Sequence, residues 1–225
     1  MHKRRAVGVV HRLSCETHDV DSQEAEDEHM RNIVVGIGVA WCIMSCQAAH
    51  SDGPEPTCSN CPGTYISANE ISEYLKKAIA ERRIDQQVRD VDIGKARVAI
   101  GFVHRGKLDA PLPYSVAEHD QVSEVYHVID GSGTLVLGPD LIDKKRRPAD
   151  DPIVRFINGP GNNAASIRNG ESYQLKAGDV VVIPAGTGHW FTRIDDHIDY
   201  LMIRIDPDKV TPLKDERESR GYLQK

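Results

Sequence analysis

Short apolar segments that alternate with glycine-rich turns dominate the second half of this 225-residue chain, from Arg97 onward. The segments expected to be β-strands are 97–104, 124–129, 134–137, 180–183, 189–193 and 200–205. Turn signals such as Asp130-Gly131-Ser132-Gly133 and Ala177-Gly178-Asp179 separate them. Strands this short and this closely spaced favour an antiparallel sandwich or barrel, so the fold class is predicted to be all-β.

One helix is expected before the strands. Ser67, followed by Glu70 three positions later, has the spacing of a capping box at a helix N-terminus. The apolar stripe of this helix is Ile71, Tyr74, Leu75 and Ile79. We therefore divide the chain into a polar extension with a signal peptide (1–49), a linker (50–64), an N-terminal helical segment (65–96), a barrel (97–206) and a C-terminal tail (207–225). The long interval between Gly138 and Gly178 is expected to be a loop that shapes access to the barrel.

Residues 30–49 have the layout of a secretory signal peptide. Met30-Arg31-Asn32 gives a positive start, and an apolar run follows from Ile33 to Met44 before small residues. The run is shorter than the roughly 20 residues of a membrane-spanning helix. We therefore interpret Met30 as the true start and predict export to the periplasm or the outside of the cell. A buried helix or an uncleaved anchor stays open, as does a lipid anchor, because Ile43-Met44-Ser45-Cys46 resembles a lipobox that ends at Cys46.

Net charge and cysteine content limit the kinds of partner and cellular compartment that we expect for this chain. The formal net charge of -6 and the pI near 5.9 provide no overall basic field, so a nucleic-acid partner is not expected. Cys58 and Cys61 form a Cys-x-x-Cys pair without a second pair, in a loop-like stretch. A local disulfide in an oxidising compartment is the favoured interpretation, and a metal-binding or reactive pair is the alternative.

Two segments carry motifs that resemble those of the cupin superfamily. The second motif has a glycine, five residues, Pro-x-Gly, two residues and a histidine, at Gly178, Pro184, Gly186 and His189. The first has a glutamate, six residues and a glycine, at Glu124 and Gly131. The resemblance covers about 95 residues, near 110–205. It implies a cupin jelly-roll β-barrel with the N-terminal helix beside it, and a homodimer.

The same resemblance implies a metal site. In cupins the first motif supplies two histidines and a glutamate, and the second supplies one histidine. Here the wider family spacing places the second histidine at His119 and the first at Ala117, whereas the narrower spacing reaches Glu118 and Asp120. One imidazole is missing with either spacing. The predicted ligands of one divalent ion are therefore His119, Glu124 and His189, a set that suits Fe, Mn, Ni or Zn.

Strand alternation makes Tyr126 a candidate catalytic residue. Side chains of Glu124 and Tyr126 share one face of their strand, so an inward Glu124 implies an inward Tyr126. Its hydroxyl is interpreted as a fourth ligand or a substrate-facing group, or as a filler of the barrel with a hydrogen-bonded hydroxyl. His127 falls on the opposite face.

Three classes of function are compatible with these features. The first is an exported metal-dependent cupin enzyme of the lyase, isomerase or dioxygenase type that acts on a small organic substrate. The second is a non-catalytic module that captures a sugar or an organic acid. The third is a structural or dimerisation role with no ligand. A barrel that holds no metal, with His119 and His189 as structural residues, also stays open.

Overall fold

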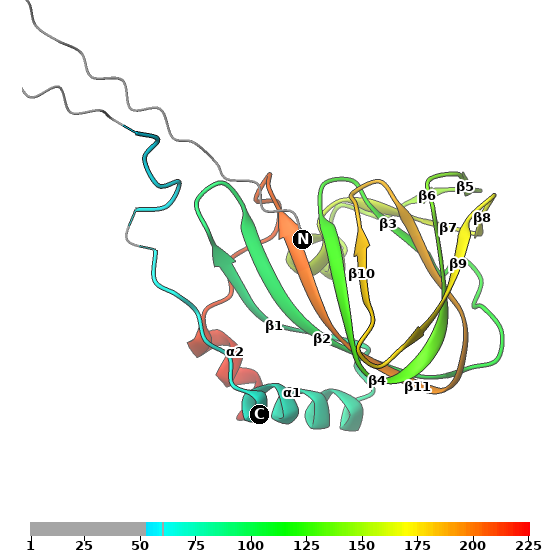
Figure 1. The fold of residues 1–225 in the computed structure, drawn as a ribbon, viewed down its shortest axis with the longest axis horizontal. Helices are drawn as coiled ribbons and strands as arrows, with labels where there is room; N and C mark the ends of the chain where they lie inside the picture. Colours follow the sequence, from blue (N-terminus) through cyan, green and yellow to red (C-terminus); the bar gives the residue numbers. More distant parts are fainter. Residues whose placement is uncertain (1–52, 60) are drawn as a thin grey trace, which may run out of the picture. The chain divides into compact units, whose positions relative to one another are not determined.

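The computed structural model describes residues 53–59 and 61–225, and these form a two-layered jelly-roll barrel with two helices at one side (Figure 1). The predicted signal peptide and the candidate lipid anchor at Cys46 lie outside the described residues. In chain order the elements are α1 (Ala68–Ala80), β1 (Asp85–Asp92), β2 (Arg97–Leu108), β3 (Val116–His119), β4 (Ser123–Gly138), β5 (Leu141–Ile142), β6 (Lys145–Arg146), the π-helix η1 (Val154–Asn158), β7 (Gly161–Ala164), β8 (Ser166–Ile167), β9 (Glu171–Lys176), β10 (Val180–Ile183), β11 (Gly188–Asp206) and α2 (Glu216–Leu223).

Two long strands, β4 and β11, bend and so belong to both layers. One layer has the order β1, β2, β11, β4, β10, and uses residues 198–206 of β11 and 123–130 of β4. The other has the order β6, β7, β3, β11, β4, β9, and uses the opposite end of each long strand. All of these pairings are antiparallel, which confirms the predicted all-β fold.

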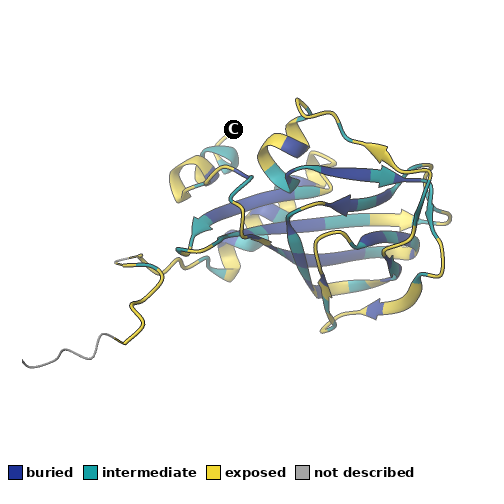
Figure 2. Cartoon of the chain, turned by 90° about the horizontal axis from the view of Figure 1, so that it is seen from above, coloured by how far each residue is buried: buried dark blue, intermediate teal, exposed yellow. Residues whose placement is uncertain are grey.

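The core lies between the two layers, where alternate residues of β4, β10 and β11 meet (Figure 2). Its members are Val103, Tyr126, Val128, Leu135, Leu175, Ile183, Phe191, Ile194, Ile198, Tyr200 and Met202. Tyr126 and Tyr200 stack with ring centroids 4.4 Å apart, and Phe191 continues the row at 5.9 Å from Tyr200. The inward parity expected for Tyr126 is thus observed, and His127 is exposed.

Helix α1 begins as the sequence predicts but presents a different face to the sheet. The Ser67 hydroxyl accepts a hydrogen bond from the Glu70 backbone N–H at 3.1 Å. The buried positions are Glu70, Tyr74 and Ala78, whereas Ile79 is exposed, so the predicted stripe is displaced. The Glu70 carboxylate belongs to this buried face and accepts a 2.6 Å hydrogen bond from Arg89 on β1.

Several elements add to the predicted layout. The segment 65–96 contains strand β1, whose polar side chains are buried against partners from other elements, and the C-terminal tail contains α2. The interval 138–178 is not one long loop, because β5 to β9 and η1 lie within it. Strands β6, β7 and β9 extend the barrel sheet, and β5 and β8 pair with each other. Cys58 and Cys61 form a disulfide. No helix of the described residues is both long and apolar enough to cross a membrane.

Candidate metal centre

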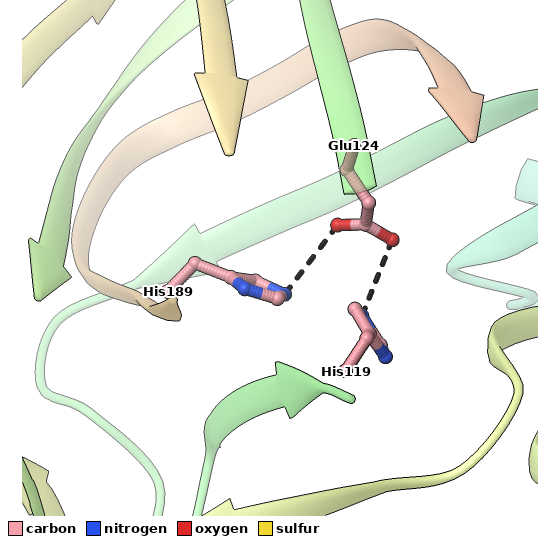
Figure 3. A group of neighbouring side chains, drawn as sticks. All are labelled: His119, Glu124 and His189. Atoms are coloured by element: carbon pink, nitrogen blue, oxygen red, sulfur yellow. Dashed lines mark ion pairs between the residues drawn. The ribbon is translucent and has the colours of Figure 1, made fainter. Parts of the chain in front are cut away.

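The structure brings His119, Glu124 and His189 together inside the barrel, each from a different strand (Figure 3). His119 is the last residue of β3, Glu124 is the second residue of β4 and His189 is the second residue of β11. His119 Nε2 lies 3.3 Å from Glu124 Oε1, and His189 Nε2 lies 3.5 Å from Glu124 Oε2. One donor atom from each residue lies within 4.8 Å of the others, and all three side chains are buried.

Hydrogen bonds from the turn between β10 and β11 connect the two motifs. The Gly186 backbone N–H donates to the His119 carbonyl at 2.7 Å, and the Ala185 N–H donates to the Ser123 hydroxyl at 3.0 Å. Gly186 has φ +80°, a conformation that residues with a Cβ rarely adopt, which explains the glycine of the second motif. Through these bonds His189 reaches the residues of the first motif.

The strand order and the meeting of both motifs inside the barrel decide the fold. The described residues have the jelly-roll barrel fold that the resemblance to cupins predicts. No family model matches the sequence, and no curated protein matches it.

Several solved structures are similar to the chain at low sequence identity. The BH2720 protein of Bacillus halodurans is 12% identical over 71% of this chain and 96% of its own, with a TM-score of 0.36. A cupin protein of Bacteroides fragilis is 17% identical over 70% and 93%, with a TM-score of 0.33. KdgF from Halomonas is 15% identical over 56% and 81%, with a TM-score of 0.31.

Both carboxylate oxygens of Glu124 have partners besides the histidines. The Tyr126 hydroxyl donates to Oε2 at 2.9 Å, and the Arg204 Nε–H donates to Oε1 at 3.2 Å. Burial alone would raise the pKa of Glu124, but His119, His189 and Arg204 lower it well below its usual range. Glu124 is therefore a carboxylate at neutral pH, the form that binds a cation.

His189 is oriented as a metal ligand. Its Nδ1 lies 3.3 Å from the Thr187 carbonyl oxygen, which can only accept, so the proton of the neutral ring belongs on Nδ1. Burial lowers the pKa of His189 to about 4, so the ring is neutral at pH 7. The Nε2 lone pair then faces a carboxylate oxygen of Glu124 at 3.5 Å. Two acceptors facing each other in a buried site leave a place that a cation fits.

The distances agree with this interpretation. Two ligand atoms that each lie about 2.1 Å from one ion, at tetrahedral or octahedral angles, are about 3.0–3.4 Å apart. The two histidine–carboxylate separations, 3.3 Å to Oε1 and 3.5 Å to Oε2, are near that spacing, and one donor atom from each of the three residues lies within 4.8 Å of the others. The donor set of two imidazoles and a carboxylate therefore fits a first-row divalent ion.

His119 has a less usual neighbour. Its Nδ1 lies 3.3 Å from Nη1 of Arg147, and a guanidinium can only donate. Metal-bound histidines ordinarily donate from the second ring nitrogen to a carboxylate or a carbonyl. Arg147 therefore favours the tautomer of His119 with its proton on Nε2, pointing at Glu124, and opposes the metal-binding tautomer.

The Tyr126 hydroxyl forms a hydrogen bond with the Glu124 carboxylate. The side chain is 1% exposed, and burial together with the Glu124 charge raises its pKa well above the usual value of 10. Tyr126 therefore stays protonated and donates to the carboxylate. Phe191, which shares strand parity with His189, lines the cavity beside it.

That cavity measures about 250 Å³ and opens at the end of β2. Ala117 and His189 both line it, and they face each other in the register of β3 and β11. Ala117 is the position where the wider cupin spacing would place another histidine. Its small side chain leaves room beside the three candidate ligands for a water molecule or a substrate.

Three arginines of this region were not predicted from the sequence. Arg204 and Arg147 contact the candidate ligands, and Arg105 lines the cavity. Arg204 could have been found from its parity, because it shares a strand face with Tyr200 and Met202, which are core residues. The basic run at residues 144–147 gave no such signal for Arg147.

Proposed function

We propose that this chain is a metal-dependent cupin enzyme that acts on a small organic substrate. The observation that carries the proposal is the convergence of His119, Glu124 and His189 on one buried point beside a cavity of about 250 Å³. A divalent ion at such a site would polarise a carbonyl, stabilise an enolate or activate a water molecule. Three protein ligands would leave room on the ion for a water molecule or a substrate, as a catalytic site requires.

The residues around the ligands have separable tasks in this proposal. Arg204 and Tyr126 hold the Glu124 carboxylate in place from two directions, and Thr187 orients the His189 ring. Phe191 and the neighbouring apolar side chains exclude water from one wall of the cavity. The substrate class and the reaction type, whether lyase, isomerase or dioxygenase, belong to the test below.

The test is turnover by metal-loaded protein over a panel of carboxylates, enols and sulfonium compounds. We expect at least one substrate to react, and we expect the reaction to stop after chelation and to resume when the metal is restored. Tyr126→Phe keeps the ring and removes the hydroxyl, so loss of turnover with metal retained would mark that hydroxyl as catalytic. Metal binding without any turnover over the panel would contradict the enzyme and favour the non-catalytic binding module.

Export is a second part of the proposal. The supports are the signal-peptide layout of residues 30–49 and the Cys58–Cys61 disulfide, since disulfides persist mainly in oxidising compartments. We expect N-terminal sequencing of the native protein to find a mature start between Cys46 and His50. A cytosolic protein with Met1 intact would contradict export.

A further inference from the structure

Arg105 is a partly buried cation, and Asp85, the carboxylate whose charge helps to raise its pKa, is already paired with Arg204. Within the part of the chain that the structure describes, its guanidinium forms no salt bridge. Arg204, by comparison, is buried against Asp85 and Glu124. An arginine that is taken out of water usually has an anionic partner, because desolvation of the charge is otherwise uncompensated.

The strand register directs Arg105 into the barrel. Arg105 shares the inward face of β2 with Val103, which is fully buried in the core. Its Nε–H donates to the Tyr200 hydroxyl at 3.1 Å, and its guanidinium carbon lies 5.1 Å from the centre of the Phe191 ring. These two aromatic side chains hold the guanidinium in one plane at the cavity wall.

Two nitrogens of the Arg105 guanidinium are available for further hydrogen bonds. Of its three guanidinium nitrogens only Nε has a hydrogen-bond partner among the described residues. The two terminal NH₂ groups present a pair of parallel donors, the arrangement that matches the two oxygens of a carboxylate. Both Arg105 and His189 line the cavity, so a molecule held by Arg105 would lie beside the candidate metal centre.

The rest of the lining is largely apolar. Leu108, Phe191 and Ile194 form its inner part, and Ile84 and Leu112, both exposed, stand at its rim. Lys107 is the other cation of the lining, but it is solvent-exposed and already paired with Asp109 at 3.1 Å. Among the described residues, Arg105 is therefore a positive group without a salt bridge in a cavity whose lining is mostly apolar.

We propose that the cavity binds a small organic carboxylate with an apolar body, and that Arg105 receives its carboxylate group end-on through the two terminal NH₂ groups. The inference rests on the proposed function only in taking this cavity as the substrate site. It names the substrate class, and it assigns Arg105 as the residue that selects anions over neutral molecules of the same shape.

Two pairs of probes of equal shape test the charge selection: benzoate against benzamide, and hexanoate against hexanamide. Calorimetry or NMR titration of the full chain, freed of metal with a chelator, should show at least one carboxylate binding about tenfold more tightly than its amide. Arg105→Gln should reduce that preference to within about twofold. Arg168→Gln, a change at an exposed arginine outside the cavity lining, should preserve it.

The contradicting outcomes are distinct. Equal binding of carboxylate and amide by the parent protein, or a preference that survives Arg105→Gln, would overturn the assignment. A preference that appears only when one equivalent of Mn²⁺ is added would show the carboxylate on the metal instead, and would also overturn it. If the protein binds no metal at all, the proposed enzyme fails while the Arg105-dependent preference can still be observed.

The parent protein gives a check that needs no variant, should Arg105→Gln fold poorly. Titration with the carboxylate should shift the NMR signal of the Arg105 Nε–H and the backbone signals of Phe191 and His189. Titration with the matching amide should leave the Arg105 signal in place. Shifts confined to other surfaces would contradict the site.

Discussion

Glu124 has four partners for two oxygens: His119 and Arg204 lie at Oε1, and His189 and Tyr126 lie at Oε2. Of these, Arg204 and Tyr126 are hydrogen-bond donors, while His189 presents a lone pair. The carboxylate is thus fixed in orientation before any ion arrives. A ligand held in this way loses little freedom on binding, which favours a defined coordination geometry.

Stability of the metal-free protein should fall in acid because of these buried groups. Burial lowers the pKa of His189 to about 4 from 6.5, so between these pH values the unfolded chain binds the proton that the folded chain excludes. The free energy of unfolding should therefore decrease as the pH falls from 6.5 to 4, by on the order of 3 kcal/mol. Glu124, whose folded pKa lies well below 4.5, adds loss in the same direction at lower pH.

Urea titrations at several pH values, with a chelator present, measure this dependence. His189→Asn is the control, since a side chain that does not titrate should flatten the slope between pH 4 and 6.5. An unfolding free energy in the parent protein that does not change across this range would show that His189 is not held neutral by burial.

Arg147→Gln should strengthen metal binding. A glutamine oxygen can accept from Nδ1 of His119, so the ring proton moves there and Nε2 is left free for the ion. The change also removes a positive charge next to a divalent cation. Outer-shell changes of this kind alter affinity about 10- to 100-fold, so we expect about a tenfold lower dissociation constant.

Competition with a chelator of known affinity measures the effect, and Arg146→Gln is the matched control because Arg146 pairs with exposed Asp120. Arg147 also binds Asn163 Oδ1 and the Asn162 carbonyl, so a melting curve must show that the variant remains folded. Weaker metal binding by a folded Arg147→Gln protein would contradict the tautomer argument.

The sequence indicates the ligands better than their surroundings. Glu124 and His189 belong to motifs whose spacing can be read in the sequence. His119 is found by counting back from Glu124 with the wider cupin spacing. The partners cannot be found in this way, because Arg204 lies 80 positions from Glu124 and only the pairing of β4 with β11 brings them together. Long-range neighbours of this kind depend on strand register, which local patterns do not define.

At the level of elements, β4 and β11 cross both layers of the barrel and pass very close to each other at the bend. Gly131 marks this point with φ +74°, and a Cβ added there would collide with the His197 carbonyl. Register irregularities in β11 between Arg193 and Ile198 accompany the bend. The glycine of the first motif is thus explained by the close approach of two backbones.

Gly131→Ala should therefore destabilise the barrel, by about 1–3 kcal/mol, because the new methyl group meets backbone and the positive φ is strained. Gly106→Ala is the control: its φ lies outside the positive range and a Cβ there meets no atom within 4 Å. Denaturant midpoints compare the two variants. Equal stability of Gly131→Ala and the parent would mean that the strands separate there at little cost.

The same bends explain where prediction from the sequence was incomplete. The two predicted strands 124–129 and 134–137 are one strand, β4, because the turn-like residues Asp130 to Gly133 form the bend and not a hairpin. Likewise the segments 189–193 and 200–205 join in β11. Strand β1 was missed because its residues are polar, and their burial depends on partners such as Glu70 and Thr211 that lie far away in sequence.

For the whole molecule, the outer face of β4 and β10 is largely apolar, and none of the described residues covers it. Val180 and Val182 are 61% and 64% exposed and lie beside His127 and Val125 in the register of the two strands. Helix α1 packs on β1 and β2 and contributes no cover to this face. The resemblance to cupins implies a homodimer, and a second subunit is the partner that we propose here.

We therefore predict a homodimer through this face, and Val182→Lys should dissociate it because a charge would have to be buried. Ile93→Lys, at an exposed apolar residue in the turn between β1 and β2, is the control and should stay dimeric. Sedimentation velocity measures both. A parent protein that is monomeric at every concentration would contradict the dimer, and a dimeric Val182→Lys protein would move the interface elsewhere.

The most direct test of the central claim is the metal content of the purified protein and of three variants, His119→Ala, Glu124→Gln and His189→Ala. We expect about one first-row divalent ion per parent chain and a loss of affinity of about 10-fold or more in each variant. Circular dichroism should show that the barrel persists, since the core lies mainly in other residues. A parent chain without metal, or folded variants that bind metal as tightly as the parent does, would show that these three residues are not its ligands.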